Sequence, residues 1–310
     1  MQLSLILPCY NEEEVLEETS VKLLSLFSSL IESSKIHDSS TICFIDDGSS
    51  DDTWDIIETL SQKNKHISGI KLSRNFGHQN ALLSALLTVK GDVVISIDAD
   101  LQDDISMIEK MIDQHRNGND IVYGVKMKRD ADSTFKRITA EGFYKIMHIM
   151  GVNIIYNHAD FRLLSRRVIE HLKEYKEVNL FLRGLVPLVG FKSTTVSYDI
   201  SDRTAGESKF PLRKMLGFAW NGISSFSITP LRFITTVGFF LFISTLFLSI
   251  HSLWIALFTD EAVPGWASTV LPIYFLGGVQ MLSIGIIGEY IGKIYLETKA
   301  RPRYIIEKTV

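Results

Sequence analysis

Two long apolar stretches in the last third of the chain restrict its fold more than any other feature. Residues 234–258 contain His251 as their only ionisable side chain, and residues 270–288 contain no Asp, Glu, Lys or Arg. Both stretches exceed the ~18 apolar residues that mark a candidate membrane span. Core helices of a soluble domain, the alternative, would carry a polar stripe that neither stretch has. The sequence therefore predicts two transmembrane helices, over 234–258 and 270–288.

The charges beside these stretches predict their orientation. The intervening loop carries Asp260 and Glu261 but no Lys or Arg, whereas five basic residues follow the second stretch. By the positive-inside rule, both flanks face the cytoplasm. Residues 211–232 fit an amphipathic interfacial helix, and a packed linker helix explains their pattern equally well. We expect a cytoplasmic domain over 1–210, a juxtamembrane segment over 211–232, and a membrane domain with a cytoplasmic tail over 233–310.

Charge and cysteine content exclude other classes of protein. The net charge is −4, so the chain lacks the basic excess of a nucleic-acid-binding protein. Its two cysteines, Cys9 and Cys43, lie in apolar runs that read as buried strands, which argues against a secreted disulfide framework. The N-terminus has no basic segment before its short apolar run, so we expect no signal peptide. These features favour a multi-pass protein of the cytoplasmic membrane.

The first half of the chain alternates between strand and helix patterns. Short apolar or β-branched runs cover 3–7, 41–45, 68–72 and 93–97, and helical patterns cover 12–30, 53–60, 79–89 and 105–115. This order predicts right-handed crossovers and an α/β fold with a Rossmann-like, mainly parallel, doubly wound sheet. Ligands of such sheets bind beyond the carboxyl ends of the strands.

Acidic residues follow two of these predicted strands. Asp46 and Asp47 follow the second, and Asp98 and Asp100 follow the fourth, two positions apart on the same side of the chain. One or two carboxylates together with substrate phosphates are the usual ligands of Mg²⁺. Neither Gly-x-Gly-x-x-Gly nor a P-loop follows the first strand, so a metal and basic side chains must meet phosphate charge. Candidate basic residues are Lys126, Lys128, Arg129, Lys136, Arg137 and Arg162.

Four sequence motifs, in their order along the chain, resemble those of a known protein family. They are Leu5-Ile6-Leu7-Pro8-Cys9-Tyr10-Asn11-Glu12, Asp46-Asp47-Gly48-Ser49, Ser73-Arg74-Asn75-Phe76-Gly77 and Asp98-Ala99-Asp100-Leu101-Gln102-Asp103. The chain resembles family 2 glycosyltransferases with a GT-A fold. With Asp160-Phe161-Arg162-Leu163, the run from Arg203 to Phe210 and the two spans, it resembles more closely the polyisoprenyl-phosphate glycosyltransferases, including bactoprenol glucosyltransferases of O-antigen and lipopolysaccharide modification and dolichol-phosphate mannose synthase. The resemblance extends over essentially the whole chain.

The resemblance implies roles for individual residues. Donor binding is implied for Pro8, Tyr10, Glu12, Asp47, Arg74 and Asp98, metal binding for Asp98 and Asp100, catalysis for Asp100, Asp160 and Arg162, and binding of the acceptor phosphate for Arg203 and Lys209. Many relatives continue the metal motif with Gln-Asp-Pro-Pro, whereas this chain continues Gln102-Asp103-Asp104-Ile105. That departure bears on how the following helix begins.

Residues and resemblance together predict an inverting sugar transfer. The donor is a UDP-sugar, most simply UDP-glucose, the acceptor is undecaprenyl (polyprenyl) phosphate, and the cofactor is Mg²⁺ or Mn²⁺. The acceptor phosphate has a second pKa near ~6 and needs little deprotonation. We therefore expect Asp160 mainly to orient Arg162 or the acceptor. His78 is expected only to cap or pack at the start of a helix, and His158 is ambiguous.

Other interpretations keep parts of this prediction. The same fold could transfer mannose, an aminosugar or aminoarabinose, or add a sugar to a glycolipid. A chain of another class would be a non-catalytic, membrane-anchored nucleotide-sugar-binding protein. Glycines in and near the second span are typical of helix packing and predict a homo-oligomer. A flippase and a downstream glycosyltransferase are the expected functional partners.

Overall fold

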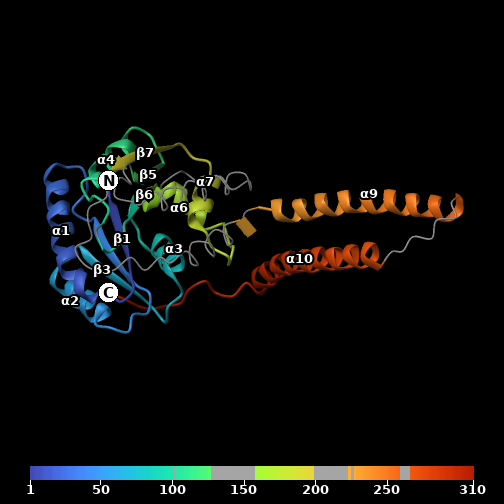
Figure 1. The fold of residues 1–310 in the computed structure, drawn as a ribbon. Coiled ribbons are helices and arrows are strands. Elements are labelled where there is room, and N and C mark those ends of the chain that lie inside the picture. Colours follow the sequence, from blue (N-terminus) through green and yellow to red (C-terminus); the bar gives the residue numbers. More distant parts are fainter. Residues whose placement is uncertain (101, 127–157, 199–222, 225–226, 259–265) are drawn as a thin grey trace. The chain divides into compact units, whose positions relative to one another are not determined.

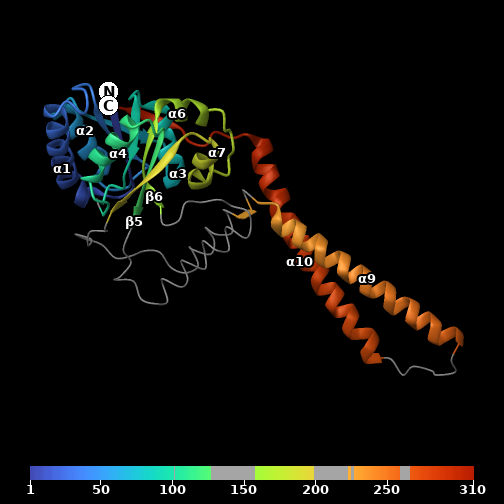
Figure 2. The same cartoon turned by 90° about the horizontal axis from the view of Figure 1, so that it is seen from above.

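A computed structural model describes residues 1–100, 102–126, 158–198, 223–224, 227–258 and 266–310. The described residues fall into two compact units. The head unit contains residues 1–100, 102–126, 158–198 and 300–310, and the helical unit contains 223–224, 227–258 and 266–299. Figures 1 and 2 show the elements of each unit in two orientations. The two units are described separately below.

The head unit is built on one sheet with the strand order β7-β5-β6-β4-β1-β2-β3-β8. The strands are β1 Leu3–Cys9, β2 Thr41–Asp46, β3 Ile67–Leu72, β4 Val93–Ser96, β5 Ile121–Lys126, β6 His158–Ser165, β7 Ser193–Tyr198 and β8 Ile306–Thr309. The four strands β4, β1, β2 and β3 are parallel neighbours, as predicted. Their apolar residues are buried on both faces, which is typical of parallel strands between two helical layers.

The remaining strands make the sheet mixed, so the prediction of a mainly parallel sheet requires correction. β6 is antiparallel to both β4 and β5, and β8 is antiparallel to β3, while β5 and β7 are parallel. The strand β6 contains the buried polar residues His158, Asp160 and Arg162. Because of them, the sequence of β6 lacks the apolar pattern that predicts a buried strand. The antiparallel position of β6 brings the start of that strand to the carboxyl end of β4, where Ser96 pairs with Arg162.

Helices cover both faces of the sheet, which confirms the doubly wound α/β arrangement (Figure 1). One face packs against α1 Glu13–Glu32, α2 Thr53–Lys63 and α4 Met107–Arg116, and the other against α3 His78–Thr88, α6 Arg166–Leu172 and α7 Leu182–Leu188. Successive strand residues point to opposite faces. In β2, for example, Phe44 joins the first core and Ile45 the second.

The C-terminal residues return to the sheet. β8 follows the last long helix and pairs with β3, and Gly69 and Val310 exchange two backbone hydrogen bonds of 2.8 and 3.0 Å. The Lys308 ammonium also lies 2.6 Å from a carboxylate oxygen of Glu58 in α2. Residues 300–310, predicted as the cytoplasmic tail of the membrane domain, therefore belong to the head unit.

Two long helices make up most of the helical unit: α9 Thr229–Phe258 and α10 Trp266–Lys299. They pack against each other, and the Tyr290 hydroxyl donates a 2.6 Å hydrogen bond to the Ser227 carbonyl. Large apolar side chains such as Phe240, Phe247 and Leu282 are exposed. Among the described residues, one segment, Phe275–Lys299, has the length and apolar composition of a membrane span, and Thr229–Leu241 is a shorter apolar segment. Most of the predicted juxtamembrane segment lies outside the described residues.

Both cysteine thiols are buried and free. Cys9 packs in the core beneath α1, and Cys43 packs in the core on the opposite face of the sheet. Burial raises the pKa of the Cys9 thiol well above its ordinary value and raises the pKa of Cys43 to about 11. Because thiolates are the reactive form, both residues should be unreactive in the folded protein.

We predict that the native protein reacts with no equivalent of a thiol reagent such as DTNB at about pH 8, and with two equivalents after denaturation. The measurement is absorbance of the released thiolate in detergent, with and without guanidinium chloride. Rapid labelling of one thiol in the native protein would contradict the burial of both.

Candidate active site

The carboxyl ends of β1, β2 and β4 gather the predicted donor-site residues at one edge of the sheet. Pro8 and Tyr10 lie at the end of β1, Asp46 and Asp47 at the end of β2, and Asp98 follows β4. The loop from Arg74 to Gly77 follows β3 at the same edge. Parallel strands thus bring together four sequence motifs that are far apart in the chain.

Asp47 fastens two of these loops together. Its carboxylate oxygens accept hydrogen bonds of 2.7 and 2.9 Å from the backbone N–H groups of Phe76 and Gly77. Burial raises the pKa of Asp47 above its ordinary value, and these two hydrogen bonds oppose that rise. The carboxylate of its neighbour Asp46 accepts a 2.9 Å hydrogen bond from the Ser49 N–H. Asp47 therefore fixes the loop after β3 against the end of β2.

The other predicted donor residues surround this edge. Tyr10 is exposed, and the guanidinium of Arg74 lies 4.0 Å from the centre of the Phe76 ring. The backbone N–H of Glu12 donates a 3.0 Å hydrogen bond to the Thr53 hydroxyl at the start of α2. Tyr10 thus offers an exposed aromatic ring, and Arg74 an exposed guanidinium, in the loops at this edge of the sheet.

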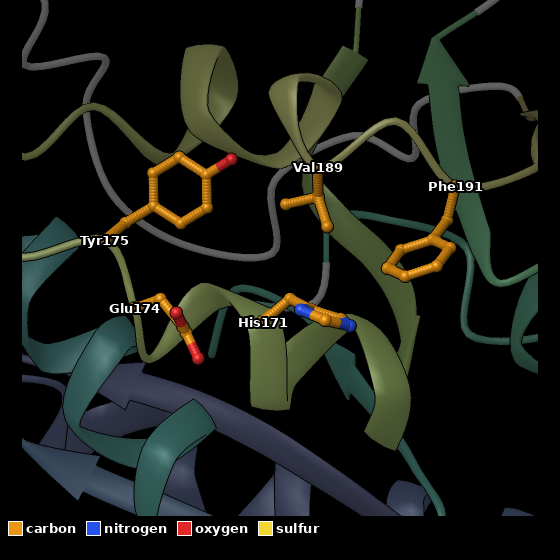
Figure 3. Close-up of a pocket in the computed structure, with 5 residues that line it drawn as sticks. All are labelled: His171, Glu174, Tyr175, Val189 and Phe191. Carbon is orange, nitrogen blue, oxygen red and sulfur yellow. The ribbon is translucent and has the colours of Figure 1, made fainter.

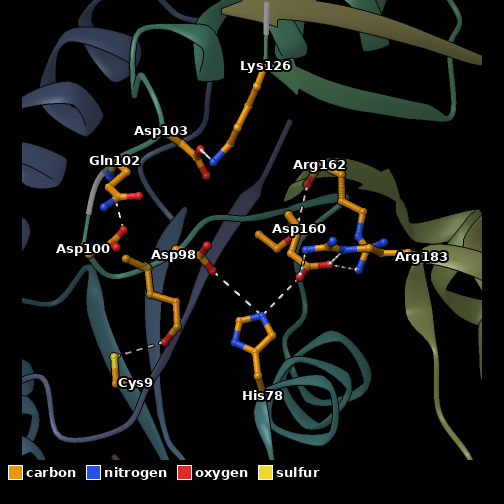
Figure 4. Close-up of polar contacts among 12 residues, drawn as sticks. Cys9, His78, Asp98, Asp100, Gln102, Asp103, Lys126, Asp160, Arg162 and Arg183 are labelled. Atoms are coloured by element: carbon orange, nitrogen blue, oxygen red, sulfur yellow. Dashed lines mark hydrogen bonds and ion pairs between the residues drawn. The ribbon is translucent and has the colours of Figure 1, made fainter. Parts of the chain in front are cut away.

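Asp98 and Asp100 lie in the loop after β4, as predicted (Figure 4). Partial burial raises the pKa of Asp98 to about 6, and the nearby carboxylates of Asp160, Asp103 and Asp100 add to the rise, while His78 opposes it. The two ligand candidates are thus held in a region of crowded negative charge, which a divalent cation would relieve.

The side chains available as metal ligands also fit such a cation. In the described part of the chain, no three His, Cys, Asp or Glu side chains converge on one metal position. Two carboxylates, with the remaining ligands supplied by substrate phosphates and water, match the ordinary coordination of Mg²⁺ and Mn²⁺. Asp98 and Asp100 are the residues that would hold the ion.

Asp160 is the centre of a second, cationic cluster (Figure 4). One carboxylate oxygen accepts hydrogen bonds from Arg162 at 3.4 Å and Arg183 at 3.3 Å, and the other accepts from Arg183 at 3.0 Å. The His78 ring nitrogen Nε2 lies 3.4 Å from Asp160 and 3.9 Å from Asp98. Burial alone would raise the pKa of Asp160, but the cations hold it well below its ordinary value.

This geometry makes Asp160 a weak proton acceptor and a strong anchor for the two arginines. His78 begins α3, as predicted, and in addition bridges the carboxylates of Asp98 and Asp160. Sequence reasoning missed Arg183 entirely. The available signal was a single arginine within the otherwise apolar run from Phe181 to Val189.

A third cluster fastens the loop after Asp100. The buried carboxylate of Asp103 accepts a hydrogen bond from the Tyr198 hydroxyl at the end of β7, and it lies 3.0 Å from the Lys126 ammonium at the end of β5. Lys126, a predicted phosphate ligand, is thus paired with a carboxylate. Lys128, Arg129, Lys136, Arg137, Arg203 and Lys209 lie outside the described residues.

A separate cavity of about 410 Å³ lies away from these clusters. Figure 3 shows the residues that line it: His171 on α6, Glu174 and Tyr175 after that helix, and Val189 and Phe191 before β7. Because β7 begins at the sheet edge opposite the carboxyl ends of β1 and β2, this cavity is not the candidate active site.

Comparison with known proteins identifies the class of this site. The family model described as glycosyl transferase family 2 matches residues 4–173. This range runs from the second residue of β1 to beyond β6 and includes every cluster residue named above except Arg183 and Tyr198. The chain belongs to glycosyl transferase family 2, and it has the GT-A-like α/β fold that the resemblance implies, with a mixed sheet in place of a mainly parallel one.

Individual relatives extend the similarity along the full chain. An uncharacterized glycosyltransferase of Bacillus subtilis, YkoT, is 51% identical, with 98% of this chain and 91% of the relative covered. The bactoprenol glucosyl transferase of Shigella phage SfX is 42% identical, and the alignment covers 99% of each chain. Among solved structures, mannosyl-3-phosphoglycerate synthase from Rubrobacter xylanophilus has a TM-score of 0.48 and 15% identity over 77% of this chain and 75% of its own.

Gly48 provides a test of the contact between the loops after β2 and β3. It has a φ of +67°, and a Cβ placed there would lie 2.4 Å from the Arg74 carbonyl carbon and 2.6 Å from the Asn75 nitrogen. We predict that Gly48→Ala costs about 1–2 kcal/mol for the left-handed backbone alone. The displaced loop adds to that cost.

Gly118 is the matched control because its φ is +85° and nothing lies within 4 Å of its Cβ position. Gly118→Ala should lower the melting temperature less than Gly48→Ala. Thermal unfolding measures both effects. Equal behaviour of the two variants would show that the loop contact has no role.

Proposed function

We propose that this protein transfers a sugar, with inversion at the anomeric carbon, from a UDP-sugar to a polyprenyl phosphate such as undecaprenyl phosphate. The observation that carries the proposal is the position of two carboxylates, those of Asp98 and Asp100, in the loop beside the cationic cluster around Asp160. The His78 ring joins Asp98 to that cluster. Glucose is the first donor to test, because a full-length relative is named a bactoprenol glucosyl transferase.

The residues divide the work between donor and acceptor. The end of β1 with Tyr10 and Glu12, together with Asp47 and Arg74, would bind the UDP part. Asp98 and Asp100 would hold Mg²⁺ or Mn²⁺, which when bound neutralises charge on the leaving diphosphate. Arg203 and Lys209 remain the residues proposed from the resemblance to contact the acceptor phosphate.

In this reaction Asp160 would orient other side chains and would not act as a general base. Two guanidinium groups and His78 surround its carboxylate, so it stays ionised and binds a proton weakly. A lipid phosphate near neutral pH is largely dianionic and attacks without losing a proton. Asp160 therefore orients Arg162 and Arg183, and the reaction needs no strong general base.

Membrane attachment suits an acceptor of this kind. A long isoprenoid chain stays in the bilayer, since each buried CH₂ contributes ~0.8 kcal/mol. The strands β7 and β8 belong to one sheet, and both α9 and α10 lie between them in the chain. A chain that enters the membrane between those strands would therefore cross it an even number of times. If the Phe275–Lys299 segment crosses, α9 provides the second crossing, with the head on the cytoplasmic side.

Other members of this class of reaction remain as alternatives. The described residues contain no contact that selects glucose over mannose or an aminosugar. A non-catalytic, membrane-anchored nucleotide-sugar-binding protein would retain UDP binding without product formation. A homo-oligomer, a flippase for the lipid-linked sugar and a glycosyltransferase that uses the product are proposed partners.

The first test is transfer of radiolabelled sugar from a panel of UDP-sugars to undecaprenyl phosphate in membranes containing the full chain. We expect activity with UDP-glucose, its loss with EDTA, and its recovery with Mg²⁺ or Mn²⁺. Asp100→Asn should lower kcat/KM by ~100-fold or more, because metal stabilisation of the leaving group provides several kcal/mol.

The control variant is Asp38→Asn, which changes an exposed carboxylate paired with Lys65 before β2, away from the site. It should retain wild-type activity. UDP binding without any lipid-linked product from any donor in the panel would support the non-catalytic alternative and refute the proposed reaction.

Topology gives an independent test that exploits the buried native thiols. Ala262→Cys in the loop between the helices should be labelled by an impermeant maleimide added outside spheroplasts. Lys110→Cys on the exposed face of α4 should be labelled only after lysis. Labelling of both positions from the same side would contradict the paired crossing.

A further inference from the structure

The two proposed metal ligands depend on one short loop for their position. The backbone pairs with β1 up to Ile97, whose N–H donates a 3.1 Å hydrogen bond to the Ile6 carbonyl, and Asp98 and Asp100 follow. Within the described ranges, no further His, Cys, Asp or Glu completes a three-ligand group with them. Mg²⁺ demands nearly ideal octahedral geometry. Freedom of this loop would therefore weaken the metal site directly.

Thr19 in α1 holds the loop at the residue between the two carboxylates. Its hydroxyl donates a 2.9 Å hydrogen bond to the Ala99 carbonyl. Thr19 and Ala99 are each 3% exposed, and Ala99 packs in the core beneath α1. A buried carbonyl that loses its donor is costly, because no water replaces the hydrogen bond. The contact with Thr19 therefore keeps the backbone at Ala99 in one position.

A second anchor holds the same loop at Asp103. Tyr198 and Lys126 end the neighbouring strands β7 and β5 and are paired in register. The Tyr198 hydroxyl donates a hydrogen bond to Asp103 Oδ1, and the Lys126 ammonium lies 3.0 Å from the same oxygen (Figure 4). Asp103 is 3% exposed, and its Oδ2 atom is buried without a hydrogen-bond partner among the described residues. The buried carboxylate thus depends on contacts made through Oδ1.

The Tyr198 ring is itself fixed in the core. It is 3% exposed and packs edge-on against Phe161 of β6, with ring centroids 5.5 Å apart and an angle of 77° between the planes. Loss of the hydroxyl alone would leave this packing in place and would change no charge near the metal ligands. Tyr198 also lies outside the residues that the family model matches.

We propose that Thr19 and Tyr198 are positioning residues that set the affinity of the site for its divalent cation. Their hydroxyls hold the loop that carries Asp98 and Asp100, one from α1 and the other from β7. The inference rests on the proposed function, in which those two carboxylates bind the metal together with the diphosphate. Groups that orient metal ligands typically contribute about 10–100-fold to metal affinity or activity.

The test measures Mn²⁺ binding to the full chain in detergent without turnover. The Kd of Mn²⁺ for the protein–UDP complex is obtained from the EPR signal of free Mn²⁺, with UDP alone as the blank. Calorimetry gives the Kd of UDP in EDTA. We expect Tyr198→Phe to raise the Mn²⁺ Kd by ~10-fold and to change the UDP Kd in EDTA less than about two-fold, because only the metal loop loses an anchor.

Excess metal should compensate for the lost anchor. The Mn²⁺ concentration for half-maximal sugar transfer by Tyr198→Phe should rise by the same factor as the Mn²⁺ Kd, while kcat at saturating Mn²⁺ falls less than about three-fold. Thr19→Val, which removes the other hydroxyl at nearly constant volume, should raise the Mn²⁺ Kd in the same way. Thr19→Ser keeps a hydroxyl and should shift the Kd less than Thr19→Val does.

Matched controls remove the same chemical groups outside the site. Tyr175→Phe removes a tyrosine hydroxyl beside the separate cavity, and Thr59→Val removes a hydroxyl that donates a hydrogen bond to the Asp55 carbonyl within α2. Both should keep the wild-type Mn²⁺ Kd. Asp100→Asn, which removes a proposed ligand, gives the reference for loss of Mn²⁺ binding.

Two results would overturn the inference. The first is a wild-type Mn²⁺ Kd in both Tyr198→Phe and Thr19→Val. The second is an equal weakening of UDP binding in EDTA, since it would assign the hydroxyls to the fold of the whole site instead of the metal loop. If Tyr198→Phe fails to bind UDP, and so fails to fold, Thr19→Val and Thr19→Ser decide by the same criteria.

Failure of the proposed function has a different signature. A wild-type protein that forms no lipid-linked product, or whose UDP complex binds no Mn²⁺, would refute the metal-dependent reaction itself. Metal-dependent transfer by the wild type, with unaltered Mn²⁺ affinity in the variants, would refute only the positioning role of Thr19 and Tyr198.

Discussion

The ion pairs of Asp160 hold the edge of the sheet together. A carboxylate that loses its water must find cations in its place, or it becomes neutral. Here Arg162 comes from the same strand, Arg183 from α7 and His78 from α3, so one charged group joins three elements. Because β6 lies between β4 and β5, the same group also fixes the strand that borders Asp98. The arrangement of charges in the site thus follows from how one carboxylate is buried.

The central four strands and their helices follow directly from the sequence. Their strands are unbroken apolar runs, and parallel strands buried on two faces leave this pattern clearly in a chain. β6 and β8 do not. β6 contains Asp160 and Arg162, whose mutual pairing makes burial of both acceptable, and no pattern in a single sequence reveals such pairing in advance. β8 has four residues, three of them exposed, and gains its place only from β3.

Part of the candidate site, too, could be predicted from the sequence, and part of it could not. Asp47, Asp98 and Asp100 were found because each follows a predicted strand, so topology alone brought them together. The contacts of His78 and Arg183 depend on how α3 and α7 pack, which involves residues about a hundred positions apart in sequence. The motif order identified the family, and family membership is confirmed. The charge balance between the acidic and cationic sides required the three-dimensional structure.

The position of β8 has a consequence for biosynthesis. Residues 306–309 complete the edge of a sheet whose other strands all precede residue 199, and both long helices are translated before β8. Until then β3 presents an unpaired edge, which is the part of a sheet most open to pairing with another chain. The head unit therefore cannot complete its sheet until both helices have been synthesised. A nascent chain that stalls within the helices would carry an incomplete sheet and would be a substrate for chaperones or proteases.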